Sequence, residues 1–517
     1  MHRTILVLLV VCLTLGAGAA PAPQQAEEQP RNTADQPALT IYNANFAVVR
    51  QNVPLDLKAG MNHVSFTDAT AHIEPDSVIL RDPQGRRALQ ILEQNYRNDP
   101  VTQERLLALF EGKTIDFQVQ RTDAQGQLRY DVVQGKIIRS GYIPHYAAMS
   151  QYGQQYYQQQ AAYATSTTPI IEVNGKLQFS LPGLPLFPTL GDNTILKPTL
   201  DWVLQTDKPG QGTAELSYIT GGMSWHADYN VVAPPKGDTI DLIGWITMDN
   251  QTGKEFENAR IKLMAGDVNK MQPGVGGGVA YAAKSMRDEA MQAAVSEKAF
   301  DEYHLYTLER ATTLHDRETK QVQFVAATGV KSQRLYVYNG AAVDPNRNYY
   351  NYEQIRNDSN YGTQSNPKVW VMQEFKNSKS NNLGMPLPKG RLRFYRRDDN
   401  GQLEFTGENE IDHTPTNETI RVYTGNAFDI VGERRRTNYH IDTSKDFLDE
   451  SFEIKVRNHK KEPVEVRIVE KLYRWVNWEL VQKSDAFRKL DSQTVEFRVQ
   501  IPPDGEKVVT YTAHYSW

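Results

Sequence analysis

The sequence predicts a mainly β protein made of several sandwich-like or barrel-like modules in series, with few short helices and an immunoglobulin-like sandwich at the C-terminal end. Three observations favour this fold class. Runs of alternating apolar and polar residues recur through most of the 517 residues, as half-buried strands require. Clusters of Gly, Asn, Asp and Pro separate these runs and predict turns. A chain of this length is ample for several apolar cores.

The first residues have the layout of a secretory signal peptide. A short basic head is followed by an apolar run over residues 5–15 and then by small residues up to Ala20. We predict that residues 1–19 are removed on export. A membrane-spanning helix needs about 20 apolar residues, and this run is shorter. The sequence therefore predicts an exported protein that is periplasmic, associated with the outer envelope, or secreted.

Composition excludes several kinds of chemistry. The single cysteine, Cys12, lies inside the predicted signal peptide, so the exported chain would have no disulfide, no cysteine-based zinc site and no cysteine nucleophile. The formal net charge of -5 indicates neither a nucleic-acid footprint nor a polybasic membrane surface. No later segment is long and apolar enough for a transmembrane helix. We predict no nucleic-acid partner.

The N-terminal part of the chain divides into three predicted segments. Residues 20–37 are rich in Pro, Gln and Glu and predict a disordered linker, because they have little to bury. Residues 38–98 predict an N-terminal β-module. Residues 99–190 predict a small β-barrel-like module that is interrupted by a Gln/Tyr-rich loop at residues 146–168. Two interpretations of this loop stay open, namely a disordered insertion and a surface on which a glycan stacks.

Two local signals lie inside the barrel-like module. Asp99 and Pro100 predict the start of a helix, since a capping residue is followed by Pro at the first helical position. Leu106 belongs to the expected buried stripe of that helix. Farther on, Asn174 and Gly175 separate two β-type runs, and this pair predicts a hairpin with a two-residue turn.

Residues 195–440 predict a central β-domain. Two of its segments, residues 271–299 and 346–366, are expected to be flexible; the Gly-rich start of the first has neither the spacing nor the lysine of a nucleotide-binding loop. Residues 303–326 predict two strands joined by a turn or crossover. Residues 244–266 predict a hairpin in which an Asn-led turn joins two strands.

Residues 441–517 predict the C-terminal portion of a β-sandwich. Phe452, Ile454 and Val456 alternate with charged residues, and a similar run follows after a second Asn-led turn, as in an antiparallel sheet with one apolar face. Residues 495–517 predict a final hairpin. The expected strands have about five to seven residues, which favours a soluble sandwich over the roughly ten-residue strands of an outer-membrane barrel.

No group of side chains predicts a catalytic, cofactor-binding or metal site, and we assign no such residue. The histidines are scattered, without the HExxH spacing of a zinc hydrolase. The neighbours Asp412 and His413 fit a loop pair better than a base with its orienting acid. Ser224 lacks the following helix of a nucleophile elbow, and Asp398 fits a hairpin turn better than a calcium loop. Residues 433–436, an acid and three arginines, predict a solvated strand face rather than a site for phosphate or an acidic glycan.

Two stretches carry a resemblance to a known family. They are YHLYTL at residues 303–308 and LGMPLPKGRLRFYRRDDNGQLEFTGENEIDHTP at residues 383–415. Residues 196–517 resemble a bacterial exported domain family of unknown function that also occurs in mucoidy inhibitor A-like proteins. Residues 42–60 resemble, more weakly, the β-module that usually precedes it. The long coiled coil of the mucoidy inhibitor type has no counterpart here, and the resemblance implies no catalytic residues.

Together, these observations predict an exported cell-envelope protein of unknown activity that binds or scaffolds and is not an enzyme. We expect a protein or glycan partner in the envelope and no cofactor. Two alternatives stay open. One is an envelope hydrolase or glycan-active enzyme, which would bring two carboxylates within about 5–10 Å. The other is an outer-membrane β-barrel, suggested by the apolar alternation of residues 509–517.

Overall fold

The computed structural model describes residues 36–98, 101–122, 126–142, 168–189, 197–266, 268–270, 295–300, 302–341 and 352–517. The predicted signal peptide, nearly all of the predicted linker, the Gln/Tyr-rich loop up to residue 167 and the segment 271–294 lie outside these residues. The described chain is mainly β, with several sheets in series and two short helices. The predicted fold class is therefore confirmed. No helix in the described ranges is long and apolar enough to cross a membrane.

An eight-stranded sheet contains the first strand of the described chain. Its strands are β1 (Ala38–Tyr42), β2 (Phe46–Leu57), β4 (Ile79–Arg81), β12 (Gly210–Gly221), β15 (Phe256–Ala265), β16 (Val295–Phe300), β17 (Tyr303–Leu308) and β18 (Thr312–Leu314). The order is β16-β17-β15-β1-β2-β12-β4, and β18 pairs with β15. β1 is antiparallel to β2 but parallel to β15, so the sheet joins distant parts of the chain. The predicted strand at residues 303–308 is confirmed.

A smaller sheet of three strands covers one end of the eight-stranded sheet. It has the order β3-β11-β5 and is formed by β3 (Gly60–Phe66), β5 (Leu89–Arg97) and β11 (Thr199–Thr206), with the 3-10 turn η2 (Pro75–Ser77) between β3 and β4. Trp202 on the central strand is 1% exposed. It belongs to the same core as Leu55 of β2 and Leu216 of β12. Strands from residues 38–98 thus share sheets and core with strands that follow residue 199.

The third sheet has thirteen strands and extends from the middle of the molecule to the C-terminal end. They are β13 (Met223–Ala233), β14 (Thr239–Asn250), β19 (Glu318–Tyr338), β20 (Lys368–Lys376), β21 (Gly390–Arg397), β22 (Leu403–Ile411), β23 (Thr419–Asp442), β24 (Phe447–Asn458), β25 (Val464–Lys471), β26 (Trp478–Lys483), β27 (Phe487–Lys489), β28 (Thr494–Ile501) and β29 (Gly505–Ser516). The main order is β22-β21-β13-β14-β19-β20-β23-β24-β29-β26, with β25, β27 and β28 on a branch from β19. The 3-10 turn η4 (Lys379–Asn381) follows β20.

Several strands are much longer than the five to seven residues that we expected. β19 has 21 residues and β23 has 24. The reason is that each serves two sandwiches in turn. Phe324 of β19 and Ile420 of β23 belong to the core shared by the N-terminal and central sandwiches, whereas Tyr338 of β19 and Ile430 of β23 belong to the C-terminal core.

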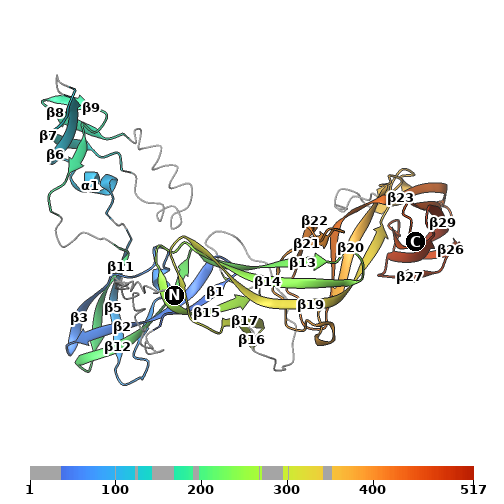
Figure 1. The fold of residues 1–517 in the computed structure, drawn as a ribbon, viewed down its shortest axis with the longest axis horizontal. Coiled ribbons are helices and arrows are strands. Elements are labelled where there is room, and N and C mark those ends of the chain that lie inside the picture. The colour runs from blue at the N-terminus through green and yellow to red at the C-terminus, as the bar shows by residue number, and fades with distance from the viewer. Residues whose placement is uncertain are drawn as a thin grey trace, which may run out of the picture.

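The three sandwich-like parts follow one another along the long axis of the molecule (Figure 1). The eight-stranded sheet faces the three-stranded sheet at one end and the strands β13, β14 and β19 in the middle, and all of them contribute to one continuous core. The C-terminal sandwich has its own core. A five-stranded sheet with a short helix is drawn apart from this row in Figure 1.

This five-stranded sheet corresponds to the predicted barrel-like module. Its strands are β6 (Thr114–Thr122), β7 (Leu128–Arg139), β8 (Ile170–Val173), β9 (Lys176–Gln178) and β10 (Leu184–Leu186). Their order, β10-β6-β7-β8-β9, is an open path, so the expected barrel-like closure is not formed by the described strands. The predicted hairpin between β8 and β9 is confirmed, with Asn174 and Gly175 both at positive φ, as its two-residue turn requires.

The helix of this module starts later than expected. α1 spans Gln103–Leu109 and its N-cap is Thr102, whose hydroxyl accepts a hydrogen bond from the Arg105 amide at 3.2 Å. Asp99 and Pro100 lie outside the described residues, and the capping position that we predicted there is wrong. The expected buried stripe is present, because Leu106 and Leu107 are buried.

Two predicted hairpins are instead connections between different sheets or different layers. β14 pairs with β13 and β19, whereas β15 pairs with β1, β17 and β18. Likewise β28 does not pair with β29. The hairpins predicted for residues 244–266 and 495–517 were therefore wrong. The successive strands β24 and β25 do not pair with each other either. In each case the chain crosses the core. The two successive strands then lie in facing layers and contact each other through apolar side chains rather than through backbone hydrogen bonds.

Two buried asparagines explain how the Asn-led turns make this crossing. Asn250 and Asn458 are both 0% exposed. In each, Oδ1 accepts from the amide two residues later, and Nδ2 donates to the carbonyl four residues later at 2.9 Å. Nδ2 also donates to two successive carbonyls of a distant segment, Leu314 and His315 or Ile501 and Pro502. The two Asn-led turns thus connect layers of the central and the C-terminal sandwich with the same set of hydrogen bonds.

Parts of the segments that we expected to be flexible carry regular structure. Residues 295–300 form β16, and Thr312–Leu314, which we placed in a turn, forms β18. Within residues 346–366, the described part begins with α3 (Tyr352–Asn357). Side chains of the C-terminal sandwich bind the backbone that follows α3, as described below.

Several carboxylates predict a loss of stability in acid. The pKa of Glu318 is lowered, chiefly by a hydrogen bond from the His315 amide, and the pKa of Asp491 is lowered chiefly by the Gln493 amide. Since the folded pKa lies below the unfolded value near about 4, their stabilising effect is present above that value and is lost as the pH falls through the folded pKa. We expect urea unfolding at pH 3 to show a lower midpoint than at pH 6. The variant Glu318→Gln should show a smaller difference between its urea midpoints at pH 3 and pH 6 than the wild type does. An equal or larger difference would contradict the role assigned to Glu318.

Candidate binding site

A groove lies on the outer face of the eight-stranded sheet, where β15, β1 and β2 run side by side. Leu39 and Ile261 point into the core and are each 1% exposed. Because side chains alternate along a strand, their neighbours Ala38 and Arg260 point to the outer face, together with Arg50 of β2. The pocket above them has a volume of about 690 Å³.

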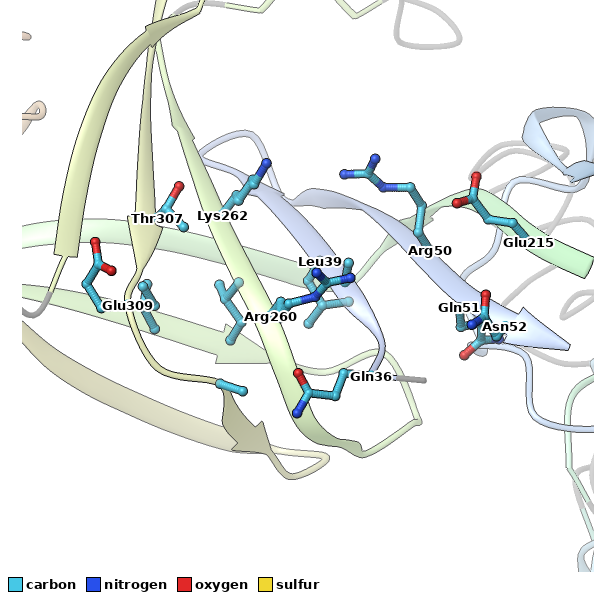
Figure 2. A pocket seen from close by; sticks show the side chains of 14 residues that line it. Gln36, Leu39, Arg50, Gln51, Asn52, Glu215, Arg260, Lys262, Thr307 and Glu309 are labelled. Atoms are coloured by element: carbon cyan, nitrogen blue, oxygen red, sulfur yellow. The ribbon is translucent and has the colours of Figure 1, made fainter. Parts of the chain in front are cut away.

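Strand register brings three cations to this groove. Ala38 is paired with Arg260 on one side and with Arg50 on the other. The two arginines therefore flank a methyl group, with Cα atoms about 10 Å apart, since neighbouring strands lie about 4.8 Å apart. Lys262 is two residues beyond Arg260 on β15 and is paired with Thr40. Figure 2 shows Arg50 on β2 and Arg260 and Lys262 on β15 around the pocket.

These cations have no counter-ion within the described part of the chain. None of Arg50, Arg260 and Lys262 forms an ion pair with a described carboxylate. Two acids also line the pocket: Glu215 is held by Arg81 at 2.7 Å, and Glu309 forms no ion pair with a described cation. The Nε atom of Arg50 is out of contact with solvent and has no hydrogen-bond partner among the described residues. Protein atoms cover this nitrogen, so it is not itself a contact for a ligand in the groove.

The positive charge of the groove also acts on its surroundings. Burial raises the pKa of Tyr42, which lies two residues beyond Thr40 on β1, and the charge of Arg50 partly offsets this effect. The rest of the lining includes amide and hydroxyl groups, among them Gln36, Asn52 and Thr307. Guanidinium and ammonium groups only donate hydrogen bonds and favour carboxylate or phosphate oxygens. The groove is thus suited to binding a hydrophilic anion.

A second group of charges is fully buried in the C-terminal sandwich. We call Arg434, Glu450, Glu470, Arg474 and Tyr511 the buried arginine cluster. The two pairs, Arg434 with Glu470 and Arg474 with Glu450, each have N–O distances of 2.9 Å and side chains that are 0% exposed. The Tyr511 hydroxyl donates to Glu470 at 2.6 Å. Burial alone would lower the pKa of Arg434, but Glu470, Tyr511 and Tyr473 together raise it above the usual value, so the guanidinium stays charged.

The buried arginine cluster binds the backbone of α3 and of the turn that follows it. Arg474 donates to the carbonyls of Ile355, Asp358 and Tyr361 at 2.5, 2.7 and 2.9 Å. Arg434 donates to the carbonyl of Gly362 at 2.8 Å. Apart from Arg434 Nη2, which is buried without a hydrogen-bond partner among the described residues, the guanidinium donors bind the paired acids or a segment of the same chain. The cluster is therefore structural rather than a site for a ligand.

The arrangement corrects our prediction for residues 433–436. Arg434 is 4% exposed, so a solvated face was wrong for this residue, although Arg435 has a side chain that is 65% exposed and is paired with Glu453. A signal for the buried position was present in the sequence. Ile430 and Gly432 lie on the buried face of β23, and alternation places Arg434 on the same face.

The other candidates from the sequence do not come together in a reactive arrangement. Asp412 has a side chain that is 94% exposed and lies 3.7 Å from Lys389, while His413 Nδ1 accepts from the Lys389 amide at 3.1 Å. Asp398 Oδ1 accepts from the amides of Asn400 and Gln402 between the paired strands β21 and β22. The prediction of a hairpin turn at Asp398 is confirmed.

One histidine on the central sheet has an oriented acidic partner. His226 Nε2 lies 3.1 Å from Asp228 Oδ2, and the two side chains are 50% and 10% exposed. Asp228 is held in place by Thr247 at 3.2 Å and by Arg393 at 3.3 Å. Ser224 lies on the same face of β13, but no hydrogen bond joins it to His226. The geometry is that of a surface ion pair.

The remaining described histidines make isolated contacts. His304 is paired with Glu297, His315 with Glu255 and His514 with Asp449. Across the described ranges, no group of three His, Cys, Asp or Glu side chains is placed to hold a metal ion.

The groove was not predicted from the sequence. Its cations come from two strands that are far apart in the chain, and only the parallel pairing of β1 with β15 brings them together. A comparison with known proteins found no matching family model, no similar curated protein and no similar solved structure. The resemblance of residues 196–517 to a bacterial exported family therefore stays a prediction.

Proposed function

We propose that this chain is an exported protein of the bacterial cell envelope that binds or scaffolds envelope components without catalysing a reaction. The observation that carries the binding role is the groove with Arg50, Arg260 and Lys262, because these cations have no described counter-ion. The signal-peptide-like start of the sequence and the resemblance to an exported family support the location. The serial sandwiches supply a scaffold that holds the groove on one face of a sheet.

A specific observation favours one alternative, an envelope hydrolase. His226 is half-exposed and oriented by Asp228, as a general base would be. No described nucleophile is bonded to it, and we therefore rank this alternative second.

Fractionation and envelope binding test the proposal together. We expect the expressed chain to be recovered outside the cytoplasm with its N-terminus at Ala20, and the purified protein to sediment with isolated envelopes. Because surface charges are screened by salt, added salt should release it. Retention in the cytoplasm with an intact N-terminus would contradict export.

Activity assays test the alternative. We expect no hydrolysis of envelope glycans by the purified protein. A hydrolytic activity that is lost in the variant His226→Ala, while the control variant His315→Ala retains it, would overturn the non-enzymatic part of the proposal.

A further inference from the structure

We propose that the groove over β15, β1 and β2 binds a hydroxylated anion, namely a sugar unit that carries a carboxylate or a phosphate group. This inference deepens the proposed function by naming the chemical class of the ligand. It rests on the binding role proposed above and not on export.

The charge of the site requires an anion. Three cations line one pocket of a chain whose formal net charge is -5, and none of them is neutralised by a described carboxylate. Of the two acids in the lining, Glu215 is paired with Arg81, which leaves Glu309 against the three cations and the lining with an excess of positive charge. A neutral or cationic ligand would leave the unmatched charges as they are, whereas an anion would compensate them.

The spacing of the cations favours a planar or tetrahedral oxyanion. Arg260 and Arg50 flank Ala38 in one row across the sheet, so that no side chain larger than a methyl group separates them. Guanidinium groups bind carboxylate and phosphate through two parallel hydrogen bonds. Lys262 adds a third donor on the same side of β15. An oxyanion lying over Ala38 would lie between the two arginines.

The rest of the pocket favours a hydroxylated ligand over an apolar one. Its volume of about 690 Å³ lies within the range for small-molecule sites, about 300–1,000 Å³. Gln36, Asn52 and Thr307 contribute amide and hydroxyl groups to the lining, and such groups exchange hydrogen bonds with sugar hydroxyls. The apolar side chains beneath the groove, Leu39 and Ile261, are buried in the core and offer little surface to a ligand.

Calorimetric titration of the full chain tests this inference. The probes are D-glucuronate for the carboxylate, D-glucose 1-phosphate for the phosphate, and D-glucose and inorganic phosphate as controls for the neutral sugar and the bare anion. We expect at least one of the two sugar anions to bind more tightly than both controls, and the tighter of the two identifies the anionic group. Raising the salt concentration should weaken this binding.

The variant Arg260→Ala separates the groove from non-specific attraction. Arg260 is exposed, so its removal should leave the thermal unfolding midpoint unchanged, while affinity for the preferred sugar anion falls about tenfold or more, the effect of one lost charge-assisted contact. Arg435→Ala is the matched control, because Arg435 is an exposed strand arginine far from the groove, and we expect wild-type affinity. The variant Arg260→Lys should retain part of the binding.

Three results would overturn the inference: no binding of either sugar anion, equal binding of D-glucose, or wild-type affinity in both Arg260→Ala and Lys262→Ala. Failure here is distinguishable from failure of the proposed function. If the variant Arg260→Ala sediments with envelopes as well as the wild-type protein does, the envelope role stands and the groove is not the site responsible for it. If sugar anions bind but the protein does not sediment with envelopes, the groove assignment stands and the envelope role fails.

Discussion

The variant Glu470→Ala should lower the free energy of unfolding of the C-terminal sandwich by about 3–5 kcal/mol, because it leaves the guanidinium of Arg434 buried without its partner. Both side chains are 0% exposed, so water cannot replace the carboxylate without opening the core. The Tyr511 hydroxyl would lose its acceptor as well. Urea unfolding followed by tryptophan fluorescence measures the effect, since Trp478 packs against the C-terminal core.

Two further variants separate charge burial from simple truncation. Glu479→Ala lies in the same sandwich, at an exposed position of β26, and we expect a change within about 0.5 kcal/mol. The double variant Arg434→Met with Glu470→Leu should recover most of the loss, because a buried ion pair replaced by apolar groups is often neutral. If Glu470→Ala unfolds as the wild type does, the buried arginine cluster contributes no stability and our account of it is wrong.

The variant Trp202→Ala should destabilise the N-terminal sandwich by about 3–5 kcal/mol, as is usual when a large buried aromatic residue is truncated. Trp202 is 1% exposed, stacks on Phe66 with ring centroids 6.2 Å apart, and donates from Nε1 to Gln94 at 2.8 Å. It therefore holds β3 and β5 to β11. Differential scanning calorimetry should show an earlier first transition.

The control for this prediction is Phe428→Ala. Phe428 is 96% exposed, so its truncation should change stability by no more than about 0.5 kcal/mol. We expect Trp202→Phe to fall between the two, since it keeps an apolar ring but loses the hydrogen bond to Gln94. Equal transitions for Trp202→Ala and Phe428→Ala would show that the three-stranded sheet does not depend on this side chain.

The strands and their faces could be predicted from the sequence because alternation is a local property. Phe452, Ile454 and Val456 were expected on one buried face of a strand, and they are 2%, 0% and 0% exposed. The same alternation also marks the buried acids. Glu450 continues the buried face of β24, and Glu470 continues the buried face of β25, so an acid on an otherwise apolar face indicates a buried cationic partner.

The pairing of the strands could not be predicted in this way. Short connections suggested hairpins, but the hydrogen bonds of Asn250 and Asn458 direct the chain across the core to another layer. The groove was still harder to predict from the sequence, because it depends on this pairing. Arg50 and Arg260 look like ordinary exposed strand residues, and only the insertion of β1 between β2 and β15 makes them neighbours. Local patterns contain no information about such long-range pairing.

The two long strands have a mechanical consequence. β19 and β23 pass from the central sandwich into the C-terminal sandwich without interruption, and 21 residues of extended chain in β19 reach about 70 Å. A pulling force applied across this junction would act on ladder hydrogen bonds in shear, and many of them would have to rupture at once. A hinge made of loose chain would yield at low force. The junction should therefore resist both stretching and bending. It would keep a fixed distance between molecules bound to the central sandwich and molecules bound to the C-terminal sandwich.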